Sequence, residues 1–441
     1  MPAHPIGSVT RTGPAFVLLG AVQILLICGI TVISVALPAV QYELGLDRGE
    51  LALVSSAYGL SFSGLLLLGG RLADLYGRRR LFLLGLGLFG CASAAALLAP
   101  GFGPLVLARF AQGIGAALAA PAAMALLPAL FPGPSRRARA LAAWGGLSGV
   151  GAVLGMFLSG VIAQWASWRW AFAVLVAASL LALAAALRLL PSDGPVRRGL
   201  LDVLGALLAA GGLSMLSYGL LGGSVARIAL GALLLIVFAL VESRAAAPLV
   251  PLSFFASRPR AVALAAIVLA SAGMAGSMFF LSLHLQQDRG LSPLRTLAIL
   301  LPYGLVLIAT GAVAGRLSAR YGPRVLLVVG LFVATVGLAL VSALDGGLLA
   351  AGLLVLPLGV GLTFAGATVT VVDDVPERQA GLAGGVVNTA MEVGPTTGLA
   401  ALVVVASGHA GGYGFALGAA ACTFALAALL AAALLRPHIR R

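Results

Sequence analysis

Two ionisable residues stand alone inside long apolar runs of the sequence, Arg109 within residues 104–130 and Glu392 within residues 379–406. If these runs lie in lipid, a charged side chain near the centre costs roughly 2.5–3.5 kcal/mol on insertion scales, so each residue must face a partner or a cavity. Burial disfavours the charged carboxylate, which makes Glu392 a candidate proton carrier. Gln112, one helical turn after Arg109, supplies a polar neighbour.

Each of these residues also has a plainer interpretation. Arg109 could extend its guanidinium to a membrane surface about one turn away. Glu392 could be a neutral acid that is hydrogen-bonded to Asn388 or Thr389 on its own helix. We favour the functional interpretation for both, because an ionisable residue inside a membrane is functional by default.

A third candidate is the turn from Gly70 to Arg80, which reads Gly-Arg-Leu-Ala-Asp-Leu-Tyr-Gly-Arg-Arg-Arg. Its glycines permit a tight turn, Asp74 can cap a helix or pair with an arginine, and the arginines favour an anionic membrane surface. A role in membrane topology alone would explain the arginines but not the positions of Asp74 and Gly77. The residues assigned to this turn are Gly70, Asp74, Gly77, Arg78 and Arg79.

The elements that position these residues are predicted to be membrane-spanning helices. The chain has 441 residues, of which 61% are hydrophobic and 9% are charged. A bilayer core of about 30 Å needs about 20 apolar residues per helix, and lipid permits only helices or closed barrels. We predict an all-α polytopic membrane protein with fourteen spans, at 15–38, 51–69, 81–99, 104–130, 140–164, 170–190, 201–222, 225–243, 261–284, 296–315, 324–343, 347–372, 379–406 and 413–435.

The basic residues predict the orientation of these spans. All 27 are arginines; with a cytoplasmic N-terminus, 21 fall in inner loops, five in outer loops and one, Arg109, within a span. This distribution follows the positive-inside rule and puts both termini in the cytoplasm. The net charge of +14 therefore reflects topology, and no nucleic-acid partner is expected. The absence of lysine excludes a Walker A phosphate loop.

An internal repeat divides the chain. Tyr58-Gly59-Leu60 stands twelve residues before Gly70-Arg71-Leu72, and Tyr303-Gly304-Leu305 stands twelve before Gly315-Arg316-Leu317, so both matches share an offset of 245. The offset carries the second span onto the tenth. We therefore predict a six-helix bundle over 1–195, an inserted helix pair over 196–245 and a second six-helix bundle over 246–441.

Two segments resemble motifs of the major facilitator superfamily. The turn from Gly70 to Arg80 resembles its motif A, and its motif B is matched by Leu105, Arg109, Gln112, Gly113, Gly115, Ala116 and Ala117. The resemblance is to the fourteen-helix drug:proton antiporter branch. It implies two bundles that rock about a central cavity, with the motif A turn as a latch and with Arg109 and Glu392 in proton coupling. We expect Tyr58, Gln112, Tyr303 and Asn388 to line the substrate cavity.

The sequence departs from the family pattern at four positions. Gly29 stands in place of an aspartate, Met156 in place of a proline, Ser159 in place of a glycine, and Ala319 in place of the second acid corresponding to Asp74. Close packing between the halves remains possible in the span 140–164, because Gly151 and Gly155 are four residues apart.

These features predict a proton-coupled exporter of small lipophilic or cationic compounds in a bacterial inner membrane. The proton is the coupling ion, no cofactor is expected, and the lipid bilayer and the small-molecule substrate are the partners of a monomer. The changes at Gly29 and Met156 leave uptake or exchange of another solute open. A membrane sensor or a lipid-modifying enzyme is disfavoured, because no cluster of polar catalytic groups shares one depth.

Overall fold

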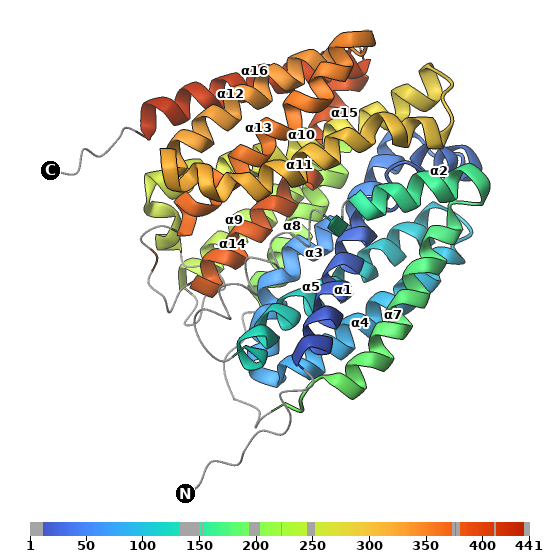
Figure 1. Ribbon diagram of the computed structural model, residues 1–441, viewed down its shortest axis with the longest axis vertical. Coiled ribbons are helices and arrows are strands. Elements are labelled where there is room, and N and C mark those ends of the chain that lie inside the picture. The colour runs from blue at the N-terminus through green and yellow to red at the C-terminus, as the bar shows by residue number, and fades with distance from the viewer. Residues whose placement is uncertain are drawn as a thin grey trace, which may run out of the picture.

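The computed structural model shows a chain built of α-helices (Figure 1). It describes residues 12–131, 150–151, 153–193, 203–221, 223–244, 252–372, 375, 380–409 and 412–435. Within these ranges, the side chains of residues 12, 67, 74, 128, 129, 203, 206, 221, 252, 253, 319, 380–382, 384, 392 and 396 are not described. Asp74 and Glu392 therefore have a described backbone only.

The long helices follow the predicted spans. They are α1 (Thr12–Thr31), α3 (Arg48–Tyr76), α4 (Arg78–Leu97), α5 (Phe102–Leu130), α7 (Arg169–Leu189), α8 (Val203–Leu221), α9 (Val225–Arg244), α10 (Arg258–Leu283), α11 (Pro293–Tyr321), α12 (Pro323–Ser342), α13 (Gly346–Val372), α14 (Ala380–Val393) and α16 (Gly412–Leu434). The shorter elements are α2 (Leu37–Leu44), helix Val153–Trp165, the 3-10 helix η2 (Leu252–Ala256), the π-helices η3 (His284–Asp288) and η5 (Gly394–Gly398), and α15 (Leu399–Ser407).

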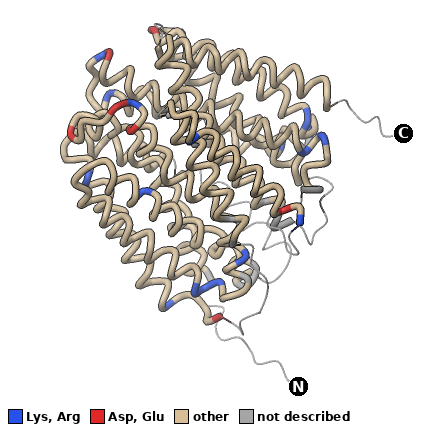
Figure 2. The backbone as a smooth tube through the Cα atoms, turned by 180° about the vertical axis from the view of Figure 1, so that it is seen from behind, with Lys and Arg blue, Asp and Glu red and all other residues tan. Residues whose placement is uncertain are grey.

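The predicted helical membrane fold is confirmed. Within the described residues, ten helices are long and apolar enough to cross a bilayer. Where they are described, the other four predicted spans are also helical and correspond to α3, helix Val153–Trp165, α8, and the run from α14 through α15. Figure 2 shows the charged residues concentrated toward the helix ends, with long uncharged stretches between them. This pattern suits a lipid environment, although the number of fourteen crossings stays a prediction.

Two of the predicted spans are interrupted. The span 15–38 was wrong at its end, because α1 stops at Thr31, residues 32–36 form turns, and α2 begins at Leu37. Pro38 lies in the first turn of α2, and a helix that continued from α1 through this position would need the backbone N–H that proline lacks. The span 379–406 likewise contains η5, where Pro395 cannot donate a backbone hydrogen bond.

The structure confirms the internal repeat. A shift of 245 residues carries the bounds of α3 onto those of α11 and the bounds of α4 onto those of α12. Both pairs are joined by one glycine with positive φ, 108° at Gly77 and 86° at Gly322. Glycine adopts this conformation without the steric cost that other residues incur. The first half, comprising the described residues within 12–193, and the second half, comprising those within 252–435, therefore share one helix-turn-helix unit in corresponding positions.

The helices pack in two groups with a pair beside them. In the first group, α5 packs against α3, α4 and α1, and α7 packs against α4 and α1. In the second, α13 packs against α10, α11 and α12, and α16 packs against α12. The two groups occupy opposite sides of Figure 1. Helix α8 contacts its partner α9 and also α3 and α15, one from each group. The predicted limits near 195 and 245 fall outside the described residues.

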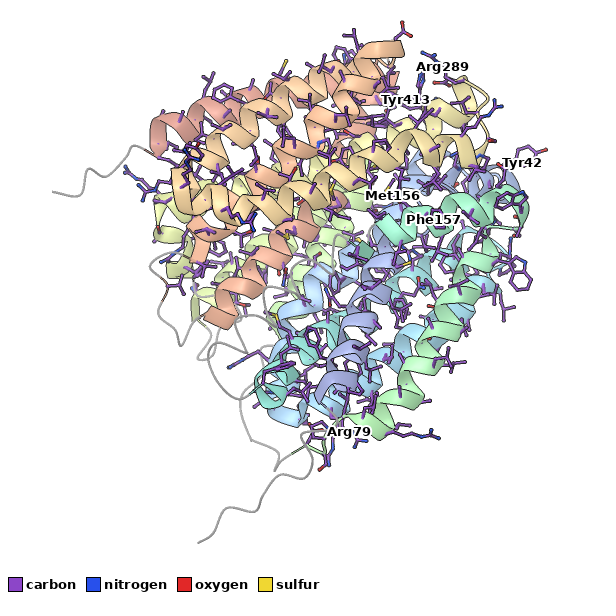
Figure 3. All side chains as sticks on the ribbon, viewed as in Figure 1. Tyr42, Arg79, Met156, Phe157, Arg289 and Tyr413 are labelled. Carbon is purple, nitrogen blue, oxygen red and sulfur yellow. The ribbon has the colours of Figure 1, made fainter. Side chains whose placement is uncertain are left out.

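Two ends of the molecule are distinguished below. Tyr42 of α2, Arg289 after η3 and Tyr413 of α16 lie toward one end, which we call the α2 end, and Arg79 lies at the opposite end (Figure 3). At the α2 end the guanidinium carbon of Arg48 lies 5.0 Å from the centroid of the Tyr413 ring, which joins the two groups.

Candidate functional site

Arg109 is buried in the middle of the first helix group. It lies on α5, its relative exposure is 0%, and it belongs to the largest fully buried side chains of the protein. The alternative in which it reaches a membrane surface is therefore wrong. A buried guanidinium needs hydrogen-bond acceptors to offset its loss of hydration, so its partners decide what it can do.

The main partner of Arg109 is the end of α1. Its Nη1 donates to the carbonyl oxygen of Gly29 at 2.7 Å. Gly29 is in the last turn of α1, where carbonyls lack intrahelical partners and carry the negative end of the helix dipole. Within the described side chains no carboxylate pairs with Arg109. A helix terminus thus supplies the compensating negative charge.

Gln112 and Ser93 extend this contact into a chain of hydrogen bonds. Nη1 of Arg109 also donates to Oε1 of Gln112 at 3.0 Å, and Nε2 of Gln112 donates to Oγ of Ser93 at 2.8 Å. The hydroxyl of Ser93 donates to the carbonyl of Phe89 at 2.7 Å. Gln112 and Ser93 are both fully buried. The chain therefore connects α5 to α4 and fixes the position of the guanidinium.

Tyr58 of α3 covers the other side of Arg109. The guanidinium carbon lies 5.1 Å from the centroid of the Tyr58 ring, a distance at which a cation is attracted to the ring face. The hydroxyl of Tyr58 donates to the carbonyl of Leu26, also on α1, at 3.0 Å. Nε and Nη2 of Arg109 have no hydrogen-bond partner among the described residues. The site therefore retains donors for an additional acceptor.

At Gly29, where the family pattern has an aspartate, the structure leaves little space for a side chain. A Cβ atom added at Gly29 would lie 3.0 Å from Cζ of Phe89, so the ring would have to move to admit any side chain. Phe89 is itself fully buried and packs edge-on against Tyr58, with ring centroids 6.4 Å apart. The space for an acidic side chain is therefore filled by an aromatic ring, and the carbonyl of Gly29 takes its place beside Arg109.

The other predicted site residues are not gathered at Arg109. Glu392 lies on α14, which packs against α3, but its side chain is outside the described residues. Asn388, on the same helix, is exposed. Tyr303 of α11 is buried, and its hydroxyl has no partner within the described residues. Of the four predicted cavity residues, Tyr58 and Gln112 contact Arg109, and Tyr303 and Asn388 belong to the second half.

The turn between α3 and α4 is held by an acid that the sequence reasoning missed. Asp193, after the end of α7, accepts hydrogen bonds from the backbone N–H groups of Arg79 at 2.8 Å and Arg80 at 2.9 Å. N–H groups in the first turn of a helix, here α4, have no acceptor within the helix itself. A Cβ atom on Gly77 would lie 2.6 Å from Cγ of Asp193, so glycine is needed there for space as well as for its φ. The signal in the sequence that could have identified Asp193 was an isolated acidic residue among loops rich in arginine.

The arginines of this turn also bond within the first half. Nη1 of Arg78 donates to the carbonyl of Ala125, and Nη2 of Arg79 donates to the carbonyl of Leu187, both at 2.8 Å. The latch to the second half stays a prediction. The side chain of Asp74 is outside the described residues. A Cβ atom added at Gly70 would lie 3.7 Å from Cβ of Pro121, an ordinary contact distance.

Replacing Asp193 by alanine is expected to lower the free energy of unfolding by about 0.5–2 kcal/mol, the usual cost of a lost helix cap. Asp193→Asn keeps one oxygen acceptor and should lose less. Thermal unfolding of the purified protein measures both. Equal melting temperatures for Asp193→Ala and the unchanged protein would contradict the capping role.

The predicted small-residue packing occurs against α1. A Cβ atom on Gly155 would lie 2.0 Å from Oγ1 of Thr31, and one on Gly151 would lie 2.9 Å from the carbonyl oxygen of Ile24. Both neighbours are in the first half, so the prediction that these glycines pack between the halves is corrected. Other residues of this helix make that contact: Leu297 of α11 lies against Gly160, and Val153 lies against Gly304.

We expect Gly155→Ala to destabilise the protein by about 1–3 kcal/mol through overpacking against α1. Gly87→Ala is the matched control, because an added Cβ there meets no atom within 4 Å. That substitution should be neutral or stabilising by up to about 1 kcal/mol, since alanine favours a helix over glycine. Thermal unfolding in the same detergent compares the two, and similar losses would refute the packing assignment.

A second missed acid, Glu43 of α2, ties the α2 end together. Its carboxylate accepts a hydrogen bond from Nε1 of Trp168 at 2.7 Å and forms an ion pair with Arg169. Arg169 also donates from Nη2 to the carbonyl of Ala99 at 2.8 Å. Trp168 is buried, with 2% relative exposure. These contacts fix α2 to the start of α7 and to the turn before α5.

Comparisons with known proteins place this arrangement in a wider group. A family model described as Major Facilitator Superfamily matches residues 19–399. The chain is 38% identical over 435 residues to a puromycin resistance protein of Streptomyces alboniger, covering 93% of this chain and 86% of that one.

Two further relatives are of similar length. The chain is 39% identical to a lincomycin resistance protein of Streptomyces lincolnensis, covering 90% of this chain and 85% of that one. It is 36% identical to a cephamycin export protein of Amycolatopsis lactamdurans, covering 91% and 87%. Among solved structures, a peptide transporter superposes with a TM-score of 0.72 at 17% identity, covering 98% of this chain and 96% of that one. This last likeness concerns the fold alone.

Proposed function

The chain belongs to the Major Facilitator Superfamily, and we propose that it exports small compounds from a bacterial cell in exchange for protons. The named resistance and export functions of the relatives, which match about nine-tenths of the chain, support the export direction. The observation that carries the coupling is the buried Arg109 site, a cation held by hydrogen bonds in the middle of the first half.

The proposed orientation places the α2 end outside the cell and the Gly77 turn in the cytoplasm. The turn contains Arg78, Arg79 and Arg80, and the positive-inside rule assigns such clusters to the cytoplasmic face. In this orientation both termini are cytoplasmic and the protein resides in the inner membrane. The contacts that join the halves at the α2 end then close the outer face.

In the proposed mechanism, the two halves alternate between access to the cytoplasm and access to the outside. Glu392 takes up a proton from outside. Its position within a membrane helix favours the neutral acid. The protonated and deprotonated forms of Glu392 prefer different access states. Proton uptake from outside therefore drives the return of the transporter to the state that is open to the cytoplasm. A membrane potential of 100 mV supplies about 2.3 kcal/mol per proton charge.

The proposal is tested by expressing the protein in a drug-sensitive bacterial host and measuring susceptibility to puromycin, lincomycin, cephamycin and other compounds. Expression should raise the inhibitory concentration of at least one compound and lower its cellular accumulation. A protonophore should restore the accumulation. If a well-expressed protein changes neither quantity for any compound, or if the protonophore has no effect, the proposal fails.

A further inference from the structure

The break after α1 creates a segment whose backbone needs partners from elsewhere. Residues 32–36, which we call the strap, run as turns between α1 and α2. Helix ends leave N–H and C=O groups without intrahelical partners, and inside a membrane each unpaired group is costly. The groups that satisfy the strap therefore decide where it can be.

The first half holds the strap through one hydroxyl. Oγ of Ser159 accepts hydrogen bonds from the backbone N–H of Val35 at 3.1 Å and of Ala36 at 3.0 Å. Ser159 is fully buried, on helix Val153–Trp165. It stands where the family pattern has glycine, which has no side chain to accept these bonds. The departure from the pattern thus has a structural consequence in this chain.

The second half holds the same strap through two other side chains. Oγ of Ser282, at the end of α10, donates to the carbonyl of Ser34 at 2.9 Å. Nε2 of Gln286, in η3, donates to the carbonyl of Val35 at 2.9 Å and to Oγ of Ser282 at 3.2 Å. The backbone N–H of Val35 is therefore bonded to the first half, and its C=O is bonded to the second half.

The other hydrogen bonds between described residues of the two halves at this end are exposed. Nε2 of Gln287 donates to Oε1 of Gln41 at 2.7 Å, and the N–H of Leu294 donates to Oε1 of Gln164 at 3.4 Å. Water can replace such bonds at little cost, whereas bonds that are shielded from water are stronger and more costly to leave unmade. Ser282 is fully buried and Gln286 is partly buried. Among the hydrogen bonds of this closure, the strap contacts are therefore the most costly to break.

We propose that Ser282 and Gln286 are the releasable lock of the outer gate, and that Ser159 keeps the strap on the first half when the lock opens. The inference rests on the alternating access of the proposed function. If the halves separate at the α2 end, the bonds from Ser282 and Gln286 must break while those from Ser159 can persist. Arg109 binds Gly29 just before the strap, so the strap moves with the Arg109 site.

A buried cysteine reporter tests the lock. Leu297 lies against Gly160 of the other half at 3% relative exposure, and Leu297→Cys is placed in a background with Cys28, Cys91 and Cys422 replaced by alanine. The full-length protein is reconstituted in nanodiscs and labelled with a polar thiol reagent, without substrate or pH gradient. Gln286→Met removes two hydrogen bonds, which should raise the labelling rate about tenfold.

The neighbouring substitution Gln287→Met is the matched control and should leave the rate within about twofold, because its bond is exposed. Ser282→Ala should accelerate labelling, and Ser159→Ala should change it by less than Gln286→Met does. Equal rates for Gln286→Met and Gln287→Met would overturn the proposal. A rise with Ser159→Ala equal to that with Gln286→Met would also overturn it, since general loosening would then explain both.

The labelling assay is independent of the exported compound. Loss of the lock appears in the labelling rate even when transport cannot be measured. Failure to move any solute would remove the proposed function and leave these rates unchanged, so the two failures are distinguishable.

Discussion

Arg109→Met is expected to lower the initial rate of substrate transport about a hundredfold or more. The substitution leaves the carbonyl of Gly29 and Oε1 of Gln112 without their buried donor. Each unsatisfied buried group costs about 1–3 kcal/mol, and together they amount to about a hundredfold in the population of the competent arrangement. Arg109→Lys retains the charge but cannot reproduce the planar fork of donors, so it should restore transport only in part.

Arg295→Met is the matched control for this prediction. Arg295 lies on α11 and is exposed, so its loss should leave the rate within about twofold. Transport is measured in vesicles containing equal amounts of each variant, and thermal unfolding shows whether the variants are folded. Near-normal transport by folded Arg109→Met would remove the guanidinium from the mechanism.

Glu392→Gln is expected to abolish uphill transport driven by a pH gradient. Glutamine has nearly the same shape as glutamate but does not take up or release a proton at physiological pH. The access states are then no longer coupled to proton movement. Exchange of substrate between the two sides should continue, because it does not require net proton transfer. Proteoliposomes loaded with unlabelled substrate measure the exchange, and an imposed pH gradient measures the uphill transport.

Asp345→Asn is the control for the loss of a carboxylate. Its side chain is 80% exposed and pairs only with the exposed Arg289 in the described contacts, so both activities should remain. Full pH-driven transport by Glu392→Gln would show that Glu392 is not the proton carrier. Loss of exchange as well would place Glu392 in substrate binding and would contradict its assignment to the proton alone.

The helices and the repeat could be predicted because both leave local marks in the sequence. Apolar runs of about 20 residues identify membrane helices, and the matching glycine turns at Gly77 and Gly322 mark corresponding positions in the halves. The burial of Arg109 followed from its place inside a run. The interruptions near Pro38 and Pro395 were also signalled, because proline has no backbone N–H to continue a helix, but a hydropathy pattern averages over such short breaks.

The partners of the functional residues could not be predicted. Asp193 caps α4 from a segment more than a hundred residues away, and Glu43 contacts Trp168 at a similar separation. Such contacts depend on how the helices pack, which the spacing of apolar residues does not specify. The sequence also showed that Gly29 stands in place of a family aspartate, but only the structure shows that the carbonyl of Gly29 lies beside Arg109.

The most direct test of proton-coupled export uses purified protein in proteoliposomes with an artificial pH gradient and a compound identified by the susceptibility panel. Compound and internal pH are recorded together. The compound is expected to accumulate on the side with the higher proton concentration while protons leave that side, and inverting the gradient should invert its movement. Movement of the compound that is the same for both gradient directions, with no accompanying change in pH, would contradict it.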